Sequence, residues 1–163
     1  VVMELCENRD LLNYISVRGA LKESSSCRLF KQLCKALQYL HNMDVGHRDL
    51  KCENLLLDKH SNLKVCDFEF SKRLSYVDGQ MALSETYCGT SSYAAPEILK
   101  NFPYNPKVSN VWSMAQLYLP LAAYHLLGLN QFQCEWTKNT AHVLCKMWHL
   151  LQAGRFTYIY QIW

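Results

Sequence analysis

The octapeptide His47-Arg48-Asp49-Leu50-Lys51-Cys52-Glu53-Asn54 carries the most specific pattern in this 163-residue sequence, H-R-D-L-K-x-x-N. Two shorter motifs follow it along the chain, Asp67-Phe68-Glu69 and Ala95-Pro96-Glu97. Each motif alone is compatible with an ordinary solvated polar loop. Together, in this order and at these intervals, they are far more specific than any one of them.

The residue types in these motifs match what phosphoryl transfer requires. The reaction needs a carboxylate beside the attacking hydroxyl, a cation on the moving phosphoryl group and oxygen ligands for magnesium. Asp49 fits the first role and Lys51 the second. Asn54 and Asp67 fit the third, because Mg²⁺ prefers carboxylate and carbonyl oxygens.

With these motifs the chain resembles the lower lobe of a protein kinase. Lys51, two residues after Asp49, and Thr90, directly after Cys88-Gly89, resemble the serine/threonine kinases rather than the tyrosine kinases. A more particular similarity is to the testis-specific serine kinases, through HRDLKCENLLLD, residues 81–84 and residues 93–99. The resemblance implies ATP and Mg²⁺ as cofactors and a protein substrate with Ser or Thr.

The resemblance also implies the fold class. It is mainly α with short β-hairpins, a truncated kinase C-terminal lobe that lacks the N-terminal lobe. Residues 1–113 resemble the family, and residues 114–163 form a divergent, hydrophobic and aromatic tail. The sequence contains no G-x-G-x-x-G loop, no phosphate-anchoring lysine of the V-A-I-K type and no helix glutamate to pair with it.

Composition supports one intracellular domain. The chain is half apolar, and 17 Lys and Arg against 14 Asp and Glu, without a basic run, give no support for nucleic-acid binding. The eight cysteines include no C-x-x-C pair, and nothing resembles a signal peptide. We therefore expect reduced thiols in a cytoplasmic protein, and no zinc site.

The apolar pattern predicts the first elements. Residues 1–5 form a short apolar run typical of a buried strand, and residues 10–17 a helix with Leu11, Leu12 and Ile15 on one face, ended by Gly19. The run Ser24-Ser25-Ser26 offers N-cap hydroxyls for a long helix to about Met43. Its apolar face consists of Phe30, Leu33, Cys34, Leu37 and Leu40. Its polar face, which we expect to face water, consists of Lys31, Gln32, Lys35 and Gln38.

A hairpin is predicted directly after residues 47–54, which by resemblance form the catalytic loop. Two apolar runs, residues 55–57 and 63–66, flank the turn-forming residues 58–62. The hairpin places Asn54 before one strand and Asp67 after the other, so both side chains can reach one metal ion.

By resemblance, five residues line the nucleotide pocket. Met3 would lie at its back, Glu4 and Cys6 would offer backbone groups to adenine, Asp10 would lie near the ribose, and Leu56 would form an apolar floor.

Residues 68–97 resemble the activation segment, which the family orders by phosphorylation. Thr86 is the expected phosphosite, and Arg48 its partner through charge-assisted hydrogen bonds. Thr90 marks the end of this segment. The alternative for Thr86 is a flexible loop rich in Ser and Thr.

Two departures from the family pattern bear on activity. Glu69 replaces the D-F-G glycine, where a left-handed side-chain residue costs about 1–2 kcal/mol. Its carboxylate also adds negative charge near the phosphates. Two unit charges about 4 Å apart repel by about 4 kcal/mol at an effective dielectric constant of about 20, so we expect weaker ATP binding. Asn110 replaces a helix aspartate that accepts N–H bonds from the catalytic loop, so we expect one buried donor to face another donor, at about 1–3 kcal/mol.

The beginning of the tail, residues 116–129, is apolar nearly all round. Pro120 interrupts it, Gln116 and His125 lie within it, and its length is borderline for a bilayer. A membrane segment is the less favoured alternative: we expect a buried helix, a frame-shifted segment or an alternative exon, and no membrane partner.

Three functions remain open from the sequence. The first is a serine/threonine protein kinase domain, with no catalysis expected from this chain alone. The second is a catalytically inactive, pseudokinase-like binding or scaffold module. The third is a partial gene product whose uncovered apolar faces depend on chaperones.

Overall fold

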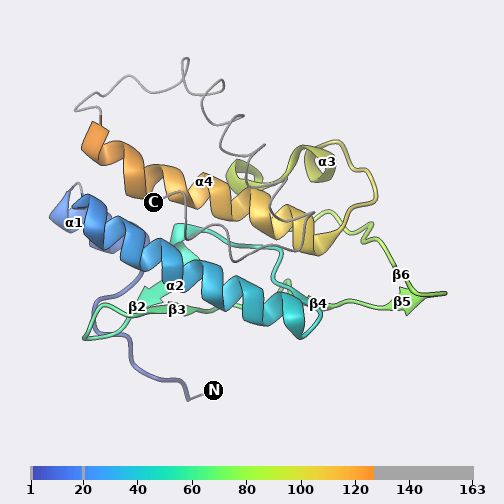
Figure 1. Ribbon diagram of the computed structural model, residues 1–163, viewed down its shortest axis with the longest axis horizontal. Helices are drawn as coiled ribbons and strands as arrows, with labels where there is room; N and C mark the ends of the chain where they lie inside the picture. The colour runs from blue at the N-terminus through green and yellow to red at the C-terminus, as the bar shows by residue number, and fades with distance from the viewer. Residues whose placement is uncertain (1, 20, 127–163) are drawn as a thin grey trace. The chain divides into compact units, whose positions relative to one another are not determined.

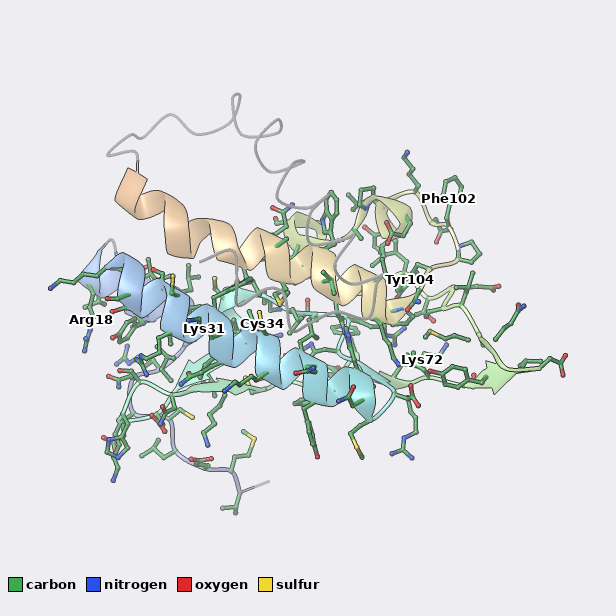
Figure 2. All side chains as sticks on the ribbon, in the orientation of Figure 1. Arg18, Lys31, Cys34, Lys72, Phe102 and Tyr104 are labelled. Carbon is green, nitrogen blue, oxygen red and sulfur yellow. The ribbon has the colours of Figure 1, made fainter. Side chains whose placement is uncertain are left out.

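Two long helices, α2 (Glu23–Asn42) and α4 (Pro106–Leu126), lie side by side in the computed structural model (Figure 1). The structure describes residues 2–19 and 21–126, which belong to one unit, Val1–Leu127. The predictions for the rest of the tail lie outside the described residues. In Figure 2, Cys34 lies on the side of α2 that faces α4, and its thiol is 3.9 Å from the sulfur of Met114.

The predicted apolar face of α2 is confirmed at its centre. Phe30, Leu33 and Leu37 are buried, whereas Cys34 and Leu40 are half-buried. Leu29, which the pattern did not include, is also buried. Helix α2 packs against α4, whose buried hydrophobic residues include Val111, Met114, Ala115 and Leu117.

Two details of the α2 prediction are wrong. The helix is capped by Lys22, whose carbonyl accepts the N–H bonds of Ser25 and Ser26, so the serines lie inside the first turn rather than before it. Gln32 does not face water. Its Oε1 accepts from the Leu63 N–H at 2.8 Å and its Nε2 donates to Asn62 at 3.3 Å, because backbone groups near a sheet edge need partners.

Helix α1 (Leu11–Arg18) agrees closely with its prediction. Asp10 caps it by accepting from the Asn13 N–H at 2.8 Å, and Gly19 ends it with φ at 72°. Leu11 and Ile15 are buried, but Leu12 is 47% exposed, so the apolar face is narrower than predicted.

Three small antiparallel sheets complete the described fold. The predicted hairpin is confirmed as β2 (Leu55–Leu57) paired with β3 (Leu63–Val65). Strand β1 (Val45–Gly46) pairs with the distant β4 (Lys72–Arg73), which fixes the beginning of the predicted activation segment. Strands β5 (Tyr76–Val77) and β6 (Gln80–Met81) form a second hairpin that points away from the long helices in Figure 1.

Three short helical turns connect these elements: η1 (Cys52–Asn54), η2 (Ser91–Tyr93) and α3 (Pro96–Leu99). The fold is therefore a set of helices with small antiparallel sheets, which confirms the coarse fold class.

The strand predicted at residues 1–5 is wrong. Val2, Met3 and Leu5 are each at least three-quarters exposed, at 101%, 76% and 79%, and residues 2–6 form no strand. A strand exists only where another strand satisfies its backbone groups, and the described residues place none beside this segment.

Helix α4 continues through Pro120 and across the predicted domain boundary at residues 113/114. Pro120, which interrupts the apolar stretch in the sequence, lies inside the helix. Of the helices that the structure describes, none has both the length and the apolar character needed to cross a bilayer.

Candidate active site

The catalytic loop brings three of the predicted residues into direct contact. Lys51 Nζ lies 2.8 Å from Asp49 Oδ2, and the Asp49 side chain is almost fully buried. The turn η1 lifts Asn54 back toward the loop, where its Nδ2 donates to the Asp49 carbonyl at 2.9 Å and to Asp49 Oδ2 at 3.1 Å. The base, the cation and one oxygen ligand of the predicted set therefore share one cluster.

Asp67 is brought to this cluster by its neighbour Cys66. The Cys66 N–H and thiol both donate to the Asn54 carbonyl, at 3.0 and 3.3 Å. Asp67 is exposed, with φ at 60°, and its charge acts on Lys51 by raising the pKa of that ammonium group, behind the larger effect of the hydrogen bond to Asp49. The β2–β3 hairpin thus brings the backbone before Asp67 against Asn54, and the role of the two residues as metal ligands stays a prediction.

Thr90 closes the cluster from the far end of the activation segment. Its hydroxyl donates to Asp49 Oδ1 at 2.7 Å, and Lys51 Nζ donates to the same hydroxyl oxygen at 3.3 Å. Gly89 makes this approach feasible. Its φ is 93°, and a Cβ there would collide with the Arg48 carbonyl oxygen.

Electrostatics keep Asp49 ionised. Burial by itself would raise the pKa of Asp49, but the hydrogen bonds from Lys51, Thr90 and Asn54 outweigh it and lower that pKa below its usual value. The pKa of Lys51 is raised by its hydrogen bond to Asp49, against the opposing effect of burial. Both shifts favour the charged pair at neutral pH.

His47 holds the catalytic loop by hydrogen bonds and has a defined tautomer. It is fully buried, its Nε2 lies 2.9 Å from the Cys66 carbonyl, and its Nδ1 accepts from the Asp49 N–H at 3.3 Å. A carbonyl only accepts, so the ring proton lies on Nε2. The ring of Phe68 packs on it at 4.9 Å between centroids, which links the catalytic loop to the Asp67 motif.

Arg48 contacts residues that were not predicted as its partners. Its Nε donates to the Phe70 carbonyl at 2.6 Å, and its Nη1 donates to the Ser84 hydroxyl at 3.0 Å and contacts the Tyr104 hydroxyl at 3.5 Å. The predicted phosphosite Thr86 is exposed, and its carbonyl accepts from the Tyr104 hydroxyl at 3.0 Å.

Tyr104, on the chain between α3 and α4 (Figure 2), therefore holds the activation segment. Its backbone forms both bridge bonds with Ser84, at 2.8 and 2.9 Å, and its ring packs with Ala95 and Ile98. Sequence reasoning gave no signal for this role, because a tyrosine in a polar loop has no distinguishing pattern.

The two unfavourable features expected at Glu69 and Asn110, a left-handed backbone and a donor facing a donor, are both wrong. Glu69 is exposed and is not among the residues with positive φ, so it carries no left-handed strain. Asp67 is the left-handed residue instead. Asn110 accepts from the Arg48 N–H through Oδ1 at 2.9 Å, and its Nδ2 lies 3.4 Å from His41 Nε2. Among the described residues, no buried side-chain nitrogen or oxygen lacks a partner, so the expected donor clash is wrong.

The predicted nucleotide residues are only partly brought together. Asp10 and Leu56 form an antiparallel bridge, and the Cys6 carbonyl accepts from the Arg9 N–H at 3.1 Å in the turn before them. Met3 is exposed, and the Glu4 carboxylate forms an exposed ion pair with Lys64 at 3.3 Å. Met3 therefore does not lie at the back of a pocket made by the described residues.

The donor chemistry fits a magnesium ion held jointly with phosphates. Within the described part of the chain, no group of three or more His, Cys, Asp or Glu side chains could hold a metal. Mg²⁺ commonly uses only one or two protein oxygens together with substrate phosphates. Asn54 uses its nitrogen for both bonds to Asp49, which leaves the amide oxygen as the coordinating end, and Asp67 offers an exposed carboxylate.

Comparison with known proteins places this geometry in a family. The model of the protein kinase domain family matches residues 1–157. The chain belongs to the protein kinase domain family.

Its relatives confirm the more particular resemblance. Testis-specific serine/threonine-protein kinase 2 of Mus musculus is 54% identical over 115 residues, covering 70% of this chain and 32% of the relative. Testis-specific serine/threonine-protein kinase 1 of Homo sapiens is 55% identical over 115 residues, covering 70% and 31%. CBL-interacting protein kinase 24 of Oryza sativa is 41% identical over 150 residues, covering 91% and 32%. The chain spans about a third of the length of these curated relatives.

Proposed function

We propose that Asp49, Lys51, Asn54 and Asp67 form the phosphoryl-transfer half of a serine/threonine protein kinase site. The reaction moves the γ-phosphoryl group of ATP to the hydroxyl of a Ser or Thr in a protein substrate. These 163 residues do not complete it by themselves in our proposal, because the sequence contains no glycine-rich loop or V-A-I-K-type lysine to hold the phosphates.

The observation that carries the proposal is the arrangement around Asp49. One carboxylate oxygen is held by Lys51 and Asn54, at 2.8 and 3.1 Å, and the other by the Thr90 hydroxyl at 2.7 Å. A carboxylate fixed in this way can orient a substrate hydroxyl and take its proton as the new O–P bond forms and the bond to the β-phosphate oxygen breaks.

The other residues have supporting roles in the proposal. Lys51 would stabilise the moving phosphoryl group with its ammonium charge. Asn54 and Asp67 would hold Mg²⁺, which when bound neutralises charge on the phosphates. The backbone of Glu4 and Cys6 would meet adenine, with Met3 behind it, while Asp10 and Leu56, which the structure places side by side, would contact the ribose and the base.

Regulation through Thr86 is part of the same proposal. Thr86 is exposed and therefore accessible to an activating kinase. The Tyr104 hydroxyl contacts both the Thr86 carbonyl and the Arg48 guanidinium, so charge added at Thr86 would act on a segment already linked to Arg48.

The alternative is a binding or scaffold module without catalysis. Glu69 favours it, because an exposed carboxylate two residues after Asp67 adds negative charge beside the proposed phosphate site. The two functions differ in one respect that can be measured, namely whether the γ-phosphoryl group reaches a protein hydroxyl.

The test is a transfer assay on two proteins. The first is the 163-residue chain alone with Mg-ATP, for which we expect no label on Ser, Thr or Tyr peptides. The second is the chain joined to the N-terminal part of the 54%-identical mouse testis-specific kinase 2, which should label Ser and Thr peptides but not Tyr peptides. Transfer by the chain alone would contradict the first half of the proposal.

Two matched variants complete the assay. Asp49→Asn should reduce transfer by the joined protein about 10²-fold or more. Asp78→Asn, in the exposed turn of the β5–β6 hairpin, removes the same charge far along the chain and should leave transfer unchanged. A joined protein that binds Mg-ATP yet transfers nothing would favour the scaffold alternative.

A further inference from the structure

His41 and Asn110 meet beside the catalytic loop. His41 lies in the last turn of α2, and Asn110 near the beginning of α4, where it is 1% exposed. The Asn110 amide bridges two partners, since Oδ1 is 2.9 Å from the Arg48 backbone nitrogen and Nδ2 is 3.4 Å from His41 Nε2.

The chemistry of these partners fixes the direction of each hydrogen bond. A backbone N–H can only donate, so the amide atom facing Arg48 must be the oxygen. The amide nitrogen therefore faces His41, and an amide nitrogen cannot accept. The contact is a hydrogen bond only when His41 Nε2 carries a lone pair and the ring proton lies on Nδ1.

His41 is in the right charge state to offer that lone pair. Burial lowers the pKa of His41 to about 4, and the positive charge of Lys107 acts in the same direction. Asp44, which pairs with Lys107 at 2.7 Å, is the acidic group nearest to that lysine in the described contacts. The imidazole is neutral at pH 7.

Arg48 is the residue whose backbone needs this support. Its φ is 70°, a left-handed conformation that is strained for a side-chain residue, and it directly precedes Asp49. Asn110 holds its N–H, and Gly89 approaches its carbonyl oxygen from the activation segment. If the Asn110 nitrogen had no acceptor, a buried donor would be left unsatisfied and the amide would lose its fixed orientation.

We propose that His41 is a positioning residue of the catalytic loop, whose Nε2 lone pair orients the Asn110 amide so that its oxygen holds Arg48 and, through it, Asp49. The pairing is specific to an amide at position 110. A carboxylate there would accept from both sides and would require the opposite tautomer, Nε2–H. His47, on the other side of the loop, already carries that opposite tautomer.

The tautomer can be measured directly. Nitrogen-15 NMR of the full chain at pH 7, with the signal assigned through His41→Gln, should show His41 protonated on Nδ1. In Asn110→Asp the signal should change to Nε2–H or to the doubly protonated ring. A wild-type His41 that is protonated on Nε2, or charged at pH 7, would overturn the proposal.

Substitution of the acceptor gives the second readout. His41→Gln keeps a carbonyl oxygen that can accept from Asn110, whereas His41→Phe keeps a ring but removes the acceptor. Amide hydrogen exchange at Arg48 should be about tenfold or more faster in His41→Phe than in His41→Gln or the wild type. The control is His60→Phe at the exposed β2–β3 turn, which should not change exchange at Arg48.

Equal exchange in His41→Phe and His41→Gln would contradict the proposal. If His41→Phe does not fold, the tautomer of the wild-type chain decides alone. The inference deepens the proposed function and rests on it for its catalytic meaning. Its two readouts need no phosphoryl transfer, so a failed transfer assay and a failed tautomer measurement remain separate results.

Discussion

The catalytic loop and residues 2–10 are the two parts of the chain predicted to handle opposite ends of ATP, and the protein holds them very differently. In the loop, His47, Asp49 and Asn54 are buried, and each exchanges hydrogen bonds with others of the group. In residues 2–10, Val2, Met3 and Leu5 are mostly exposed.

The difference separates a tightly held region from a loosely held one. The described residues fix the groups proposed to act on the phosphoryl group, because three elements converge on the catalytic loop: α2 through His41, α4 through Asn110 and the activation segment through Thr90. On the proposed adenine side, the hydrogen bonds between described residues begin at Cys6, as turn and bridge bonds to β2, and Glu4 before it forms only an exposed ion pair with Lys64. We expect local stability to follow the same division.

The largest expected change in the free energy of unfolding comes from replacing a glycine that packs against the catalytic loop, compared with a glycine in an open turn. Gly89→Ala should lower the free energy of unfolding by about 3 kcal/mol or more, because a new Cβ meets the Arg48 carbonyl in addition to the left-handed backbone cost. Gly79→Ala, with φ at 76° and nothing within 4 Å, should incur only the backbone cost of about 1–2 kcal/mol. Urea unfolding of both variants measures the difference, and equal losses would show that the loop is not tightly packed.

Acid should weaken the catalytic-loop side of the molecule. The pKa of His41 is lowered to about 4 from 6.5, so between these pH values the unfolded chain binds more protons than the folded chain. Stability should therefore fall as the pH is lowered through this range, by on the order of 3 kcal/mol at most.

The comparison is between unfolding curves of the wild type and His41→Gln from pH 7.5 to 4.5. The wild type should show the steeper loss, since His47, whose pKa is also lowered, is common to both proteins. Identical slopes in the two proteins would contradict the assignment of this effect to His41.

Elements with local signals could be predicted from the sequence. Helix α1 has a capping aspartate and a terminal glycine within one short segment, and the β2–β3 hairpin has two apolar runs around a turn. The motifs also predicted the cluster of Asp49, Lys51 and Asn54, because their spacing fits one loop followed by one helical turn.

Features that depend on distant partners could not be predicted. The strand expected at residues 1–5 needed a neighbouring strand, and Gln32 left the solvent only because the edge of β3 lies beside it. The expected clash at Asn110 failed for the same reason. Its partner His41 is 69 positions away, and no local pattern indicates which tautomer the ring adopts.

The Tyr104 hydroxyl tests how firmly the activation segment joins the catalytic loop. Tyr104→Phe leaves the ring on Ala95 and Ile98 but removes the donor to Thr86 and the contact with Arg48. We expect a loss of about 1–2 kcal/mol in the free energy of unfolding, because a carbonyl is left without its partner. Tyr87→Phe, at a 54% exposed position of the same segment, should change it by less than about 0.5 kcal/mol. Similar results for the two variants would place the stabilisation of the segment elsewhere.

The smallest expected change in the free energy of unfolding is for a substitution in the exposed residues 2–5. Leu5→Ala, at a residue 79% exposed, should change the free energy of unfolding by less than about 0.5 kcal/mol. Leu11→Ala, the same substitution six residues later at a fully buried position, should reduce it by about 2–5 kcal/mol. Thermal or urea unfolding of the two variants gives both values. A loss at Leu5 as large as that at Leu11 would mean that residues 2–5 are packed as closely as the core, and the chain would then hold the adenine side of its site as firmly as the catalytic loop.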